Sequence, residues 1–555
     1  MKQILPIKTN KIQNNQKNPH RKNCLRIVAL CILLTGLMTS CAATKTKKDV
    51  YYMTEIEPCK KVYKSLENAN PISPAIFCAD PTGIEYEGRL YVYGTNDHQQ
   101  YEGVGKSGKN TYEKIQSLVC FSTEDMVNWT YHGKIETKKI APWIIASWAP
   151  SITSRVEDDG LTHFYLYFSN SGAGVGVLTA TNPLGPWSDP LKKPLISGKT
   201  KGLGDCPAPF DPGVCIDDDG TGWLAFGGCG KAPSGTDLWP GSARIVKLGD
   251  DMISLASEIK VMPSPYFFEA SELNYINDTF VYTFNTSWDA RNEWPAQFKG
   301  VSKPSTCSMA YMTSKTPLDM DSWEYKGHYF INPGEAGMNY SNNHSHFMKY
   351  KNQYYIFYHA LILQDKFGTE GGFRSLCVDT LDVDEEALTI KTRGGSRKGL
   401  SQVENFNPYV VTNGASLATS SGIAFEYDKN GKATAISSEA GGWLVIRNVD
   451  FASGANKFFV WADCDKVSRS VANDLSGDLP GEENLPGEDD LGDIYNGNPF
   501  FELRLDNVKN EKGKVLCSAV AEGSVELNEK FTGVHDLYIL FSDAGVALNQ
   551  WKFSE

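Results

Sequence analysis

The segment RLYVYGT, from Arg89 to Thr95, is the first of five short aromatic segments that recur along the chain. The other four are HFYLYFS from His163, GWLAFGG from Gly222, TFVYTFN from Thr279 and QYYIFYH from Gln353. Their first residues are 74, 59, 57 and 74 residues apart. Short runs of aromatic and β-branched residues predict strands, and a repeat of this length fits one four-stranded β-propeller blade with an insertion. We therefore predict an all-β fold that contains a five-bladed β-propeller.

A polar residue precedes four of these segments at a nearly constant distance. The four residues are Asp80, Asp211, Glu269 and His344, which stand 9, 11, 10 and 9 residues before their segments. Because equivalent positions in successive blades lie at equivalent distances from the propeller axis, we expect three carboxylates and a histidine to meet at one end of the central channel. Carboxylates that are brought together resist ionising together, which gives them different pKa values and suits them to different roles.

The composition limits the partners that the chain can have. The chain has 555 residues, too many for one ordinary core, so two domains are expected. The formal net charge is −12 and there is no basic stripe, which argues against nucleic acid and anionic membrane surfaces as partners. Aromatic residues make up 12% of the chain, and their flat apolar faces suit a ligand such as a sugar.

The N-terminal residues have the pattern of an export signal. Basic residues and asparagine are frequent up to Arg26, the apolar run IVALCILLTGLM covers Ile27–Met38, and MTSC ends at Cys41. This order resembles a bacterial lipoprotein signal, in which Cys41 becomes the first mature residue and carries the lipid. We predict a signal peptide at 1–41, a tether at 42–70, and an exported protein held by lipid on the periplasmic or cell-surface side of a bacterial membrane. An ordinary secretory signal, cleaved at a nearby small residue, is the alternative.

Strand patterns define two further ranges. Residues 71–404 form the predicted propeller, and residues 410–555 contain three more short alternating segments, which predict a β-sandwich. These segments are GWLVIRNVDF (Gly442–Phe451), FFELRLDN (Phe500–Asn507) and GVHDLYILF (Gly533–Phe541). Between them, residues 473–493 are acidic and rich in glycine and proline. This composition favours a solvated loop over a calcium-binding loop, because the EF-hand spacing is absent.

Cysteine usage leaves two interpretations open. The chain has 13 cysteines, but no CxxC pair or HExxH motif that would suggest zinc. A disulfide pair in an exported protein is one interpretation, and free buried cysteines are the other. The cysteines concerned are Cys59, Cys78, Cys206, Cys215 and Cys229.

Six motifs between Pro71 and Glu404 together resemble glycoside hydrolase family 43. They are CADP (Cys78–Pro81), SWAPSI (Ser147–Ile152), FDPGVCIDDDGTGWLAFGG (Phe210–Gly228), FFEAS (Phe267–Ser271), NNHSHF (Asn342–Phe347) and FRSLCVDTL (Phe373–Leu381). Any one of them alone is a weak signal, whereas all six in the order of the family are a strong one. The resemblance implies a five-bladed β-propeller, which agrees with the number of aromatic repeats.

The resemblance also implies roles for single residues. Asp80 matches the catalytic base, Glu269 the general acid, and Asp211 the carboxylate that orients the acid and tunes its pKa. Arg374 matches an arginine that reaches the substrate from the last blade. His344 matches a histidine of the channel that can stand near a metal ion or a water cluster, and the order NHSH leaves the second histidine of this motif as the alternative.

Two features close to these motifs have competing interpretations. Trp148, which is followed two residues later by Pro150, belongs either to a blade core, which we favour slightly, or to an aromatic platform that binds substrate at the channel mouth. The acidic run Asp217–Asp219 lies between two predicted strands, and we interpret it as a solvated turn.

The range 410–555 resembles a family 6 carbohydrate-binding module, which implies a jelly-roll-like β-sandwich. The likeness rests on GWLVIRNVDFASGANKF, IYNGNPFFELRLDN and FTGVHDLYILFSDAGVALNQWKF. Such a domain would either bind glycan or cover part of the propeller surface.

The resemblance to family 43 implies an inverting exo-glycosidase that acts on plant cell-wall hemicellulose or on pectin side chains. The leading prediction is α-L-arabinofuranosidase activity on arabinoxylan or arabinan, and β-xylosidase activity is the alternative within the family. Asp80 would then deprotonate a water molecule while Glu269 protonates the leaving oxygen. No cofactor is required for this chemistry, although structural calcium is compatible with it. A non-catalytic glycan-binding surface lipoprotein is the alternative from another class.

Overall fold

The computed structural model describes residues 57–67, 70–289, 293–452, 454–463, 500–509, 514–519 and 522–555. Strands make up most of the regular structure of these residues, so the predicted all-β class is confirmed. Cys41 with its predicted signal, and the acidic segment 473–493, lie outside the described residues. Among the residues that are described, no helix is long and apolar enough to cross a membrane.

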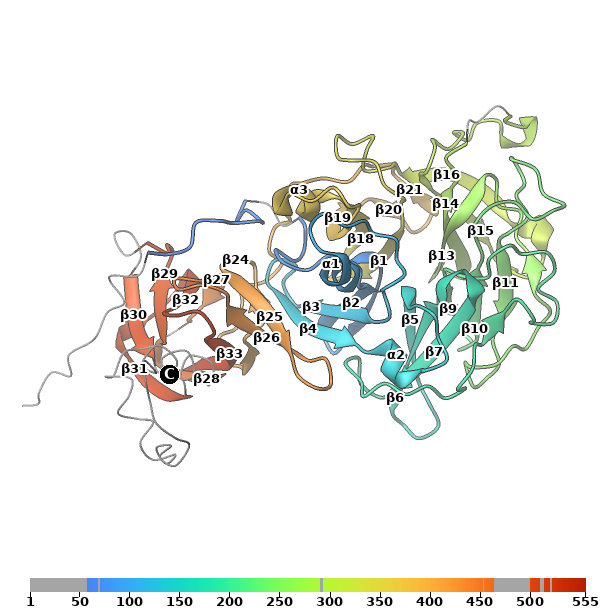
Figure 1. The fold of residues 1–555 in the computed structure, drawn as a ribbon. Coiled ribbons are helices and arrows are strands. Elements are labelled where there is room, and N and C mark those ends of the chain that lie inside the picture. Colours follow the sequence, from blue (N-terminus) through green and yellow to red (C-terminus); the bar gives the residue numbers. More distant parts are fainter. Residues whose placement is uncertain are drawn as a thin grey trace, which may run out of the picture. The chain divides into compact units, whose positions relative to one another are not determined.

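Five antiparallel sheets follow one another in chain order (Figure 1). The first contains β1 (Ala79–Tyr86), β2 (Arg89–Thr95), β3 (Leu118–Thr123) and β4 (Trp129–Ile135), and the second contains β5 (Trp148–Val156), β6 (Thr162–Ser169), β7 (Gly174–Ala180) and β8 (Ile196–Ser197). The third contains β9 (Gly213–Ile216), β10 (Gly222–Phe226), β11 (Arg244–Lys247) and β12 (Lys260–Val261). The fourth contains β13 (Phe267–Ile276), β14 (Thr279–Thr286), β15 (Met309–Ser314) and β16 (Glu324–Phe330). The fifth contains β17 (Ser345–Tyr350), β18 (Gln353–Ala360) and β19 (Ser375–Leu381), so each aromatic segment forms the second strand of its sheet.

The first hairpin of three sheets closes through a turn of two residues. These turns are Glu87–Gly88, Asn277–Asp278 and Lys351–Asn352, and all six residues have positive φ. Two successive residues with positive φ produce the turn whose twist matches that of the flanking strands. The turns therefore set the register between the first strand of a sheet and its aromatic second strand.

In three of the five sheets the first strand has a break in register near its start. The pairing of β1 with β2 shifts between Ala79 and Thr82, and similar shifts occur at the start of β5 and of β13. The backbone has positive φ at equivalent places, which are Asp80, Ala149, Asp211 and Ala270. Such bulges bend a strand and change the direction of a side chain, and Asp80 and Glu269 lie on two of them.

The first strands contact one another in a cycle. β1 contacts β5, β5 contacts β9, β9 contacts β13, β13 contacts β17, and β17 contacts β1. The approach of β9 to β13 is close enough to require a glycine, because a Cβ atom added to Gly213 would lie 2.4 Å from the Cα of Glu272. The starts of all five sheets are therefore near one another.

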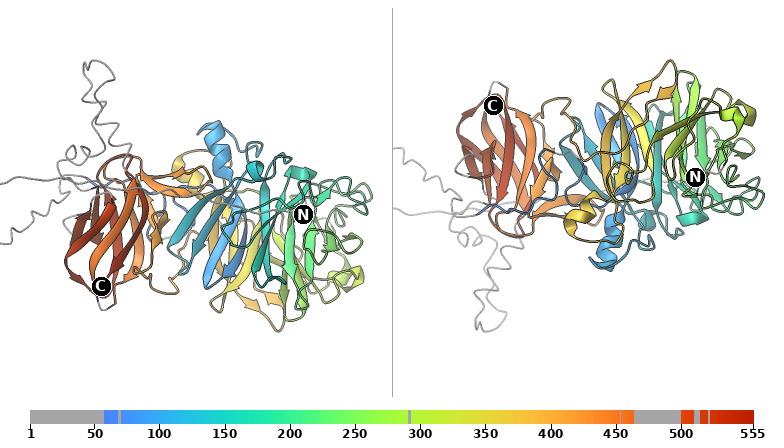
Figure 2. Two further views of the ribbon diagram at one scale, coloured as in Figure 1. Left: turned by 90° about the horizontal axis from the view of Figure 1, so that it is seen from below. Right: turned by 90° about the horizontal axis from the view of Figure 1, so that it is seen from above.

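The C-terminal part of the chain contains two more antiparallel sheets (Figure 2). One has the order β25 (Ile423–Tyr427), β26 (Ala433–Ser437), β33 (Ala547–Ser554), β28 (Ala455–Asp463) and β31 (Glu522–Phe531), with β22 (Thr412–Asn413) paired to β33. The other has the order β24 (Thr419–Ser421), β27 (Trp443–Asp450), β32 (Val534–Phe541), β29 (Phe501–Leu505) and β30 (Lys514–Ala519). The three segments predicted as strands in this range correspond to β27, β29 and β32.

The remaining elements are short. They are the helices α1 (Asp97–Val104), α2 (Thr137–Ile140) and α3 (Ile362–Phe367), the 3₁₀ turns Ser171–Ala173, Ala296–Phe298 and Met320–Ser322, and the strand pair β20 (Val383–Asp384) and β21 (Thr389–Ile390). Eight cysteines of the described residues are free, and these include the five that were considered for a disulfide.

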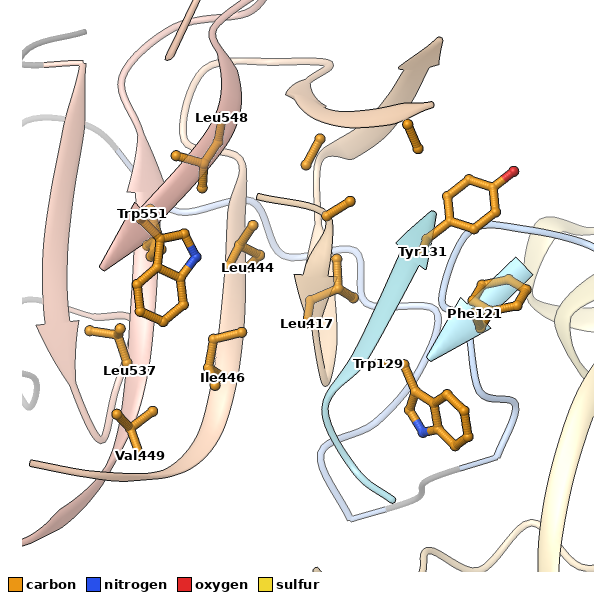
Figure 3. Close-up of a cluster of buried hydrophobic side chains, with 14 of the residues drawn as sticks. Phe121, Trp129, Tyr131, Leu417, Leu444, Ile446, Val449, Leu537, Leu548 and Trp551 are labelled. Carbon is orange, nitrogen blue, oxygen red and sulfur yellow. The ribbon is translucent and has the colours of Figure 1, made fainter. Parts of the chain in front are cut away.

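An apolar cluster joins the first sheet to the C-terminal strands. β23 (Ser416–Leu417) pairs with β4, so the first sheet gains a fifth strand from the C-terminal part of the chain. Figure 3 shows Leu417 between Leu444 of β27 and the aromatic side chains of Trp129 and Tyr131. Trp551 is fully buried in the same cluster. Burial of apolar area therefore holds these strands to the first sheet.

Residues 57–67, which belong to the predicted tether, are attached to the C-terminal strands. The Cys59 N–H donates to the Gly441 carbonyl oxygen over 2.9 Å, and the indole of Trp443 donates to the Cys59 carbonyl oxygen over 2.8 Å. Nζ of Lys64 is buried and donates to the Ile72 carbonyl oxygen over 2.8 Å. This part of the segment 42–70 is therefore held in place by specific hydrogen bonds.

Candidate active site

The four polar residues that precede aromatic segments lie close together. His344 Nδ1 is 3.7 Å from Asp80 Oδ1 and 3.9 Å from Asp211 Oδ2. The N–H of Ala270, the neighbour of Glu269, donates to Asp211 Oδ2 over 2.9 Å. Asp80, Asp211 and His344 are buried, whereas Glu269 keeps part of its surface exposed. The common spacing in the sequence thus corresponds to a common site at the starts of β1, β9, β13 and β17.

Asp80 is surrounded by donors that favour its ionised form. The hydroxyl of Thr95 donates to Oδ2 over 2.7 Å, and Nη1 of Arg374 donates to Oδ1 over 2.7 Å. The Asp80 N–H donates to Nδ1 of His359 over 3.2 Å. Burial alone would raise the pKa of Asp80, but the Arg374 guanidinium outweighs it and holds that pKa well below its ordinary value. Asp80 is therefore a carboxylate at neutral pH.

Arg374 is bound by two carboxylates. Its Nε and Nη2 donate to Asp97 over 2.9 and 2.8 Å, while its Nη1 contacts Asp80. The guanidinium lies 5.0 Å from the ring centre of Tyr112. The half-buried Trp148 donates from its indole nitrogen to the Tyr112 carbonyl oxygen over 3.2 Å, and the two rings meet edge to face. The structure therefore places Arg374 directly against Asp80, with Tyr112 and Trp148 as an aromatic wall beside it.

Glu269 has a pKa that suits proton transfer near neutrality. Burial raises the pKa of Glu269 from 4.5 to about 7, and the negative charge of Asp80 acts in the same direction. Arg374 and a hydrogen bond from the side chain of Asn342 oppose this rise. From the sequence we expected burial and the field of Asp211 to raise this pKa; burial is the largest cause, and the second is the charge of Asp80.

Asp211 is buried to the same degree as Asp80. Its own N–H donates to the hydroxyl of Ser169 over 2.8 Å, and that hydroxyl lies 3.3 Å from Oδ1. Burial raises the pKa of Asp211 well above its ordinary value, and the charges of Glu269 and Asp80 raise it further. Ionised Asp80 thus stands beside two carboxyl groups that retain protons more readily.

A second polar layer lies beside this site. Burial lowers the pKa of His344 to about 4, so its imidazole is neutral near pH 7. His346 Nδ1 is 3.6 Å from Glu272 Oε2, which accepts a hydrogen bond from Ser151 over 3.2 Å. Within the described residues, Nε2 of His344, both ring nitrogens of His346 and Oε1 of Glu272 are buried without a hydrogen-bond partner. These atoms fit contacts with water or a cation, although no group of three or more described His, Cys, Asp or Glu residues could hold a metal ion.

Several residues of the site were not predicted from the sequence, Tyr112 and Asn342 among them. Thr95, Ser169 and His359 contact the carboxyl residues, and Asp97 holds Arg374. The first three were visible as a pattern, because each is the polar residue that ends one of the quoted aromatic segments. Asp97 carried no such signal.

Comparisons with known proteins agree with this geometry. The family model described as "Glycosyl hydrolases family 43" matches residues 68–386. The arabinoxylan arabinofuranohydrolase of Bacillus subtilis (strain 168) is 31% identical over 567 residues, which cover 96% of this chain and 100% of that protein. The enzyme of the same name from Paenibacillus polymyxa is 31% identical over 528 residues, covering 88% of this chain and 74% of that protein.

A solved structure gives a similar result. The crystal structure of a family 43 arabinoxylan arabinofuranohydrolase from Bacillus subtilis, in complex with cellotetraose, matches with a TM-score of 0.74 and 29% identity. The match covers 89% of this chain and 98% of that chain. The chain is a glycoside hydrolase, and it belongs to glycosyl hydrolase family 43.

Proposed function

We propose that this chain is an inverting exo-α-L-arabinofuranosidase that removes arabinose side chains from arabinoxylan or arabinan. The observation that carries the proposal is one buried site that holds an ionised carboxylate, Asp80, together with a carboxyl group of raised pKa, Glu269. Glycoside hydrolysis needs such a pair, with one member as base and the other as acid. The relatives that are 31% identical bear the name arabinoxylan arabinofuranohydrolase, which supports arabinose as the sugar.

The roles of the carboxyl groups follow from their protonation. Asp80 takes a proton from a water molecule whose oxygen attacks the anomeric carbon. Glu269 gives its proton to the leaving oxygen as the glycosidic bond breaks, so the configuration at the anomeric carbon inverts. Asp211 fixes the backbone beside Glu269 through the Ala270 N–H, and its charge, if it formed, would oppose ionisation of the acid. Arg374 keeps Asp80 ionised, and Trp148 with Tyr112 offers aromatic surface to a sugar ring.

We also propose that the five N-terminal sheets are blades of a β-propeller spanning 71–404, and that the two C-terminal sheets pack as a jelly-roll-like β-sandwich spanning 410–555. The cycle of contacts among β1, β5, β9, β13 and β17 supports the propeller. So does the hydrogen bond from Asp80, in the first sheet, to His359, in the fifth. The likeness of the sandwich to a family 6 carbohydrate-binding module remains part of this proposal, as does calcium near His344. The neutral imidazole of His344 has the free nitrogen that a metal ligand requires, and the chemistry above needs no metal.

Product analysis tests the activity. The purified protein should release free arabinose from arabinoxylan and leave the xylan backbone intact, as measured by anion-exchange chromatography. Proton NMR at early times should show β-arabinofuranose first, because inversion of an α-linked sugar gives the β anomer. Xylose as the only product would favour β-xylosidase, and no product from any plant glycan would favour a binding protein.

The export prediction has its own experiment. We propose that Cys41 carries lipid and anchors the protein to a bacterial membrane. In a Gram-negative host, Cys41→Ala should move the protein from the detergent-extracted membrane fraction to the soluble one. Unchanged membrane association of this variant would contradict lipidation at Cys41.

A further inference from the structure

Asp97 is a buried carboxylate behind the base. It is the first residue of α1, directly after the N-cap Asn96, and its side chain is 0% exposed. Oδ1 accepts a hydrogen bond from Nη2 of Arg374 over 2.8 Å. Oδ2 accepts from Nε of Arg374 over 2.9 Å, from the Arg374 backbone N–H over 3.0 Å, and from Nδ2 of Asn110 over 2.7 Å. Both its oxygens are therefore committed, and three of the four donors belong to one residue.

These contacts fix the plane of the guanidinium. An arginine presents its N–H groups as a rigid planar fork, so the two contacts through Nε and Nη2 leave no freedom to rotate it. The ring of Tyr112, 5.0 Å away, limits movement out of the plane. The remaining nitrogen, Nη1, is then aimed at Asp80 Oδ1 over 2.7 Å. The position of Nη1 thus depends on Asp97.

Asp97 also limits how many nitrogens of the Arg374 guanidinium can donate to Asp80. A guanidinium that faced only Asp80 could turn its fork onto both oxygens of that carboxylate, which would occupy the lone pairs that must accept a proton from water. With Asp97 present, Arg374 donates hydrogen bonds from two side-chain nitrogens to Asp97 and from one to Asp80. The Thr95 hydroxyl holds the other oxygen of Asp80. Each oxygen of Asp80 therefore accepts one hydrogen bond, and the ring nitrogens of His359 and His344 lie further off, 3.3 and 3.7 Å from Oδ1.

We propose that Asp97 is a positioning residue for the catalytic base and acts through Arg374. This inference rests on the proposed function, in which Asp80 activates water. Asp97 touches neither the base nor the reacting water, so its whole effect on the reaction passes through the guanidinium. Loss of Asp97 should slow the attack of water, which is the step that Asp80 assists.

The test compares Asp97→Asn with Asp125→Asn on 4-nitrophenyl α-L-arabinofuranoside and on arabinoxylan. Asp125 is a matched control, because it is 2% exposed and accepts hydrogen bonds from the backbone N–H groups of Val127 and Asn128 in a turn outside the site. Asp97→Asn should lower kcat by about 10²-fold on both substrates, with KM changed less than about twofold, because a displaced base costs rate rather than binding. Asp125→Asn should lower Tm and leave kcat unchanged.

A double-mutant cycle separates positioning from a general structural effect. In the Asp80→Asn background, adding Asp97→Asn should cost less than about threefold, because the base on which it acts is already gone. Additive losses in this cycle, or a kcat for Asp97→Asn within about twofold of the parent, would overturn the inference.

Arg374→Lys decides the question if Asp97→Asn unfolds. A lysine keeps the charge but cannot bridge two carboxylates with a planar fork, so the folded variant should show the same loss of kcat on both substrates. Normal kcat in Arg374→Lys would contradict the inference. A parent protein that is inactive on every glycoside would instead contradict the proposed function on which the inference rests.

Discussion

Replacing Glu269 by glutamine should remove the alkaline limb of the pH–rate profile. Burial and the charge of Asp80 raise the pKa of Glu269 from 4.5 to about 7, so the acid is about half protonated at pH 7. With its ordinary pKa it would be protonated in only about 0.3% of molecules at that pH, so the site increases the active form by roughly 150-fold. Because the protonated form is the active one, the rate should be full below pH 6 and fall as the pH rises through about 7.

Leaving-group dependence shows whether the lost group is the acid. Glutamine has nearly the shape of glutamic acid but has no acidic proton to give. On arabinoxylan the leaving oxygen belongs to a sugar, so Glu269→Gln should lower kcat by about 10²–10⁴-fold. A 4-nitrophenolate leaves without a proton, so the loss on the nitrophenyl arabinoside should be no more than about tenfold.

The assay is arabinose release from arabinoxylan, and nitrophenolate release from the nitrophenyl arabinoside, between pH 4 and pH 9. The parent enzyme should lose activity above about pH 7 on arabinoxylan, and the variant should have a flat profile in that range. An alkaline limb that persists in Glu269→Gln, or equal losses on the two substrates, would show that another group donates the proton. Thermal unfolding of both proteins provides the control for folding.

Three other predictions concern stability. The folded pKa of Glu269 lies above its unfolded value, so its contribution to stability is complete below about pH 4.5 and is lost as the pH rises through about 7. Glu269→Gln should therefore be more stable than the parent at pH 8, by at most about 3 kcal/mol, with no difference at pH 4; a constant difference in thermal unfolding would contradict this. Burial lowers the pKa of Lys64 to about 7, so the parent protein loses stability as the pH falls from about 10 to 7. Lys64→Met should therefore be stabilised relative to the parent more at pH 6 than at pH 10. An equal change at both pH values would be inconsistent with a buried neutral amine. Leu417→Ala should cost about 2–5 kcal/mol in urea unfolding with kcat unchanged, because Leu417 is 3% exposed in the apolar cluster between β4 and β27; a cost below about 1 kcal/mol would show that the cluster adds little.

The spacing of polar residues before aromatic segments was sufficient to predict which residues meet. A first strand begins about ten residues before the aromatic strand with which it pairs, and turns of two residues keep that distance nearly constant. Asp80 and His344 consequently lie 3.7 Å apart, although 264 positions separate them in the sequence. Strand type and pairing followed from local pattern for the same reason.

The electrostatics of the site could not be predicted in this way. The pKa of Glu269 depends on burial, which is set by how five sheets converge rather than by residues near Glu269 in the chain. The contact of Arg374 with Asp97 spans 277 residues, and Asp97 lies in a short helix with no repeat in other sheets. A residue such as Asp97, which has no equivalent in the other sheets, cannot be found by comparing repeated positions in the sequence.

The bonds that join the sheets are also the bonds that orient the catalytic groups. The hydroxyl of Thr95, at the end of β2, accepts a hydrogen bond from the Ala149 N–H of the second sheet over 2.7 Å and donates to Asp80 of the first over 2.7 Å. Ser169, at the end of β6, does the same for Asp211 of the third sheet, and His359, near the end of β18, accepts from the Asp80 N–H. These three residues thus each tie one sheet to the next through the backbone N–H of a residue with positive φ. Because one atom serves both purposes, the carboxylates are held by the contacts that hold the sheets together, and the site needs no separate scaffold to keep its geometry.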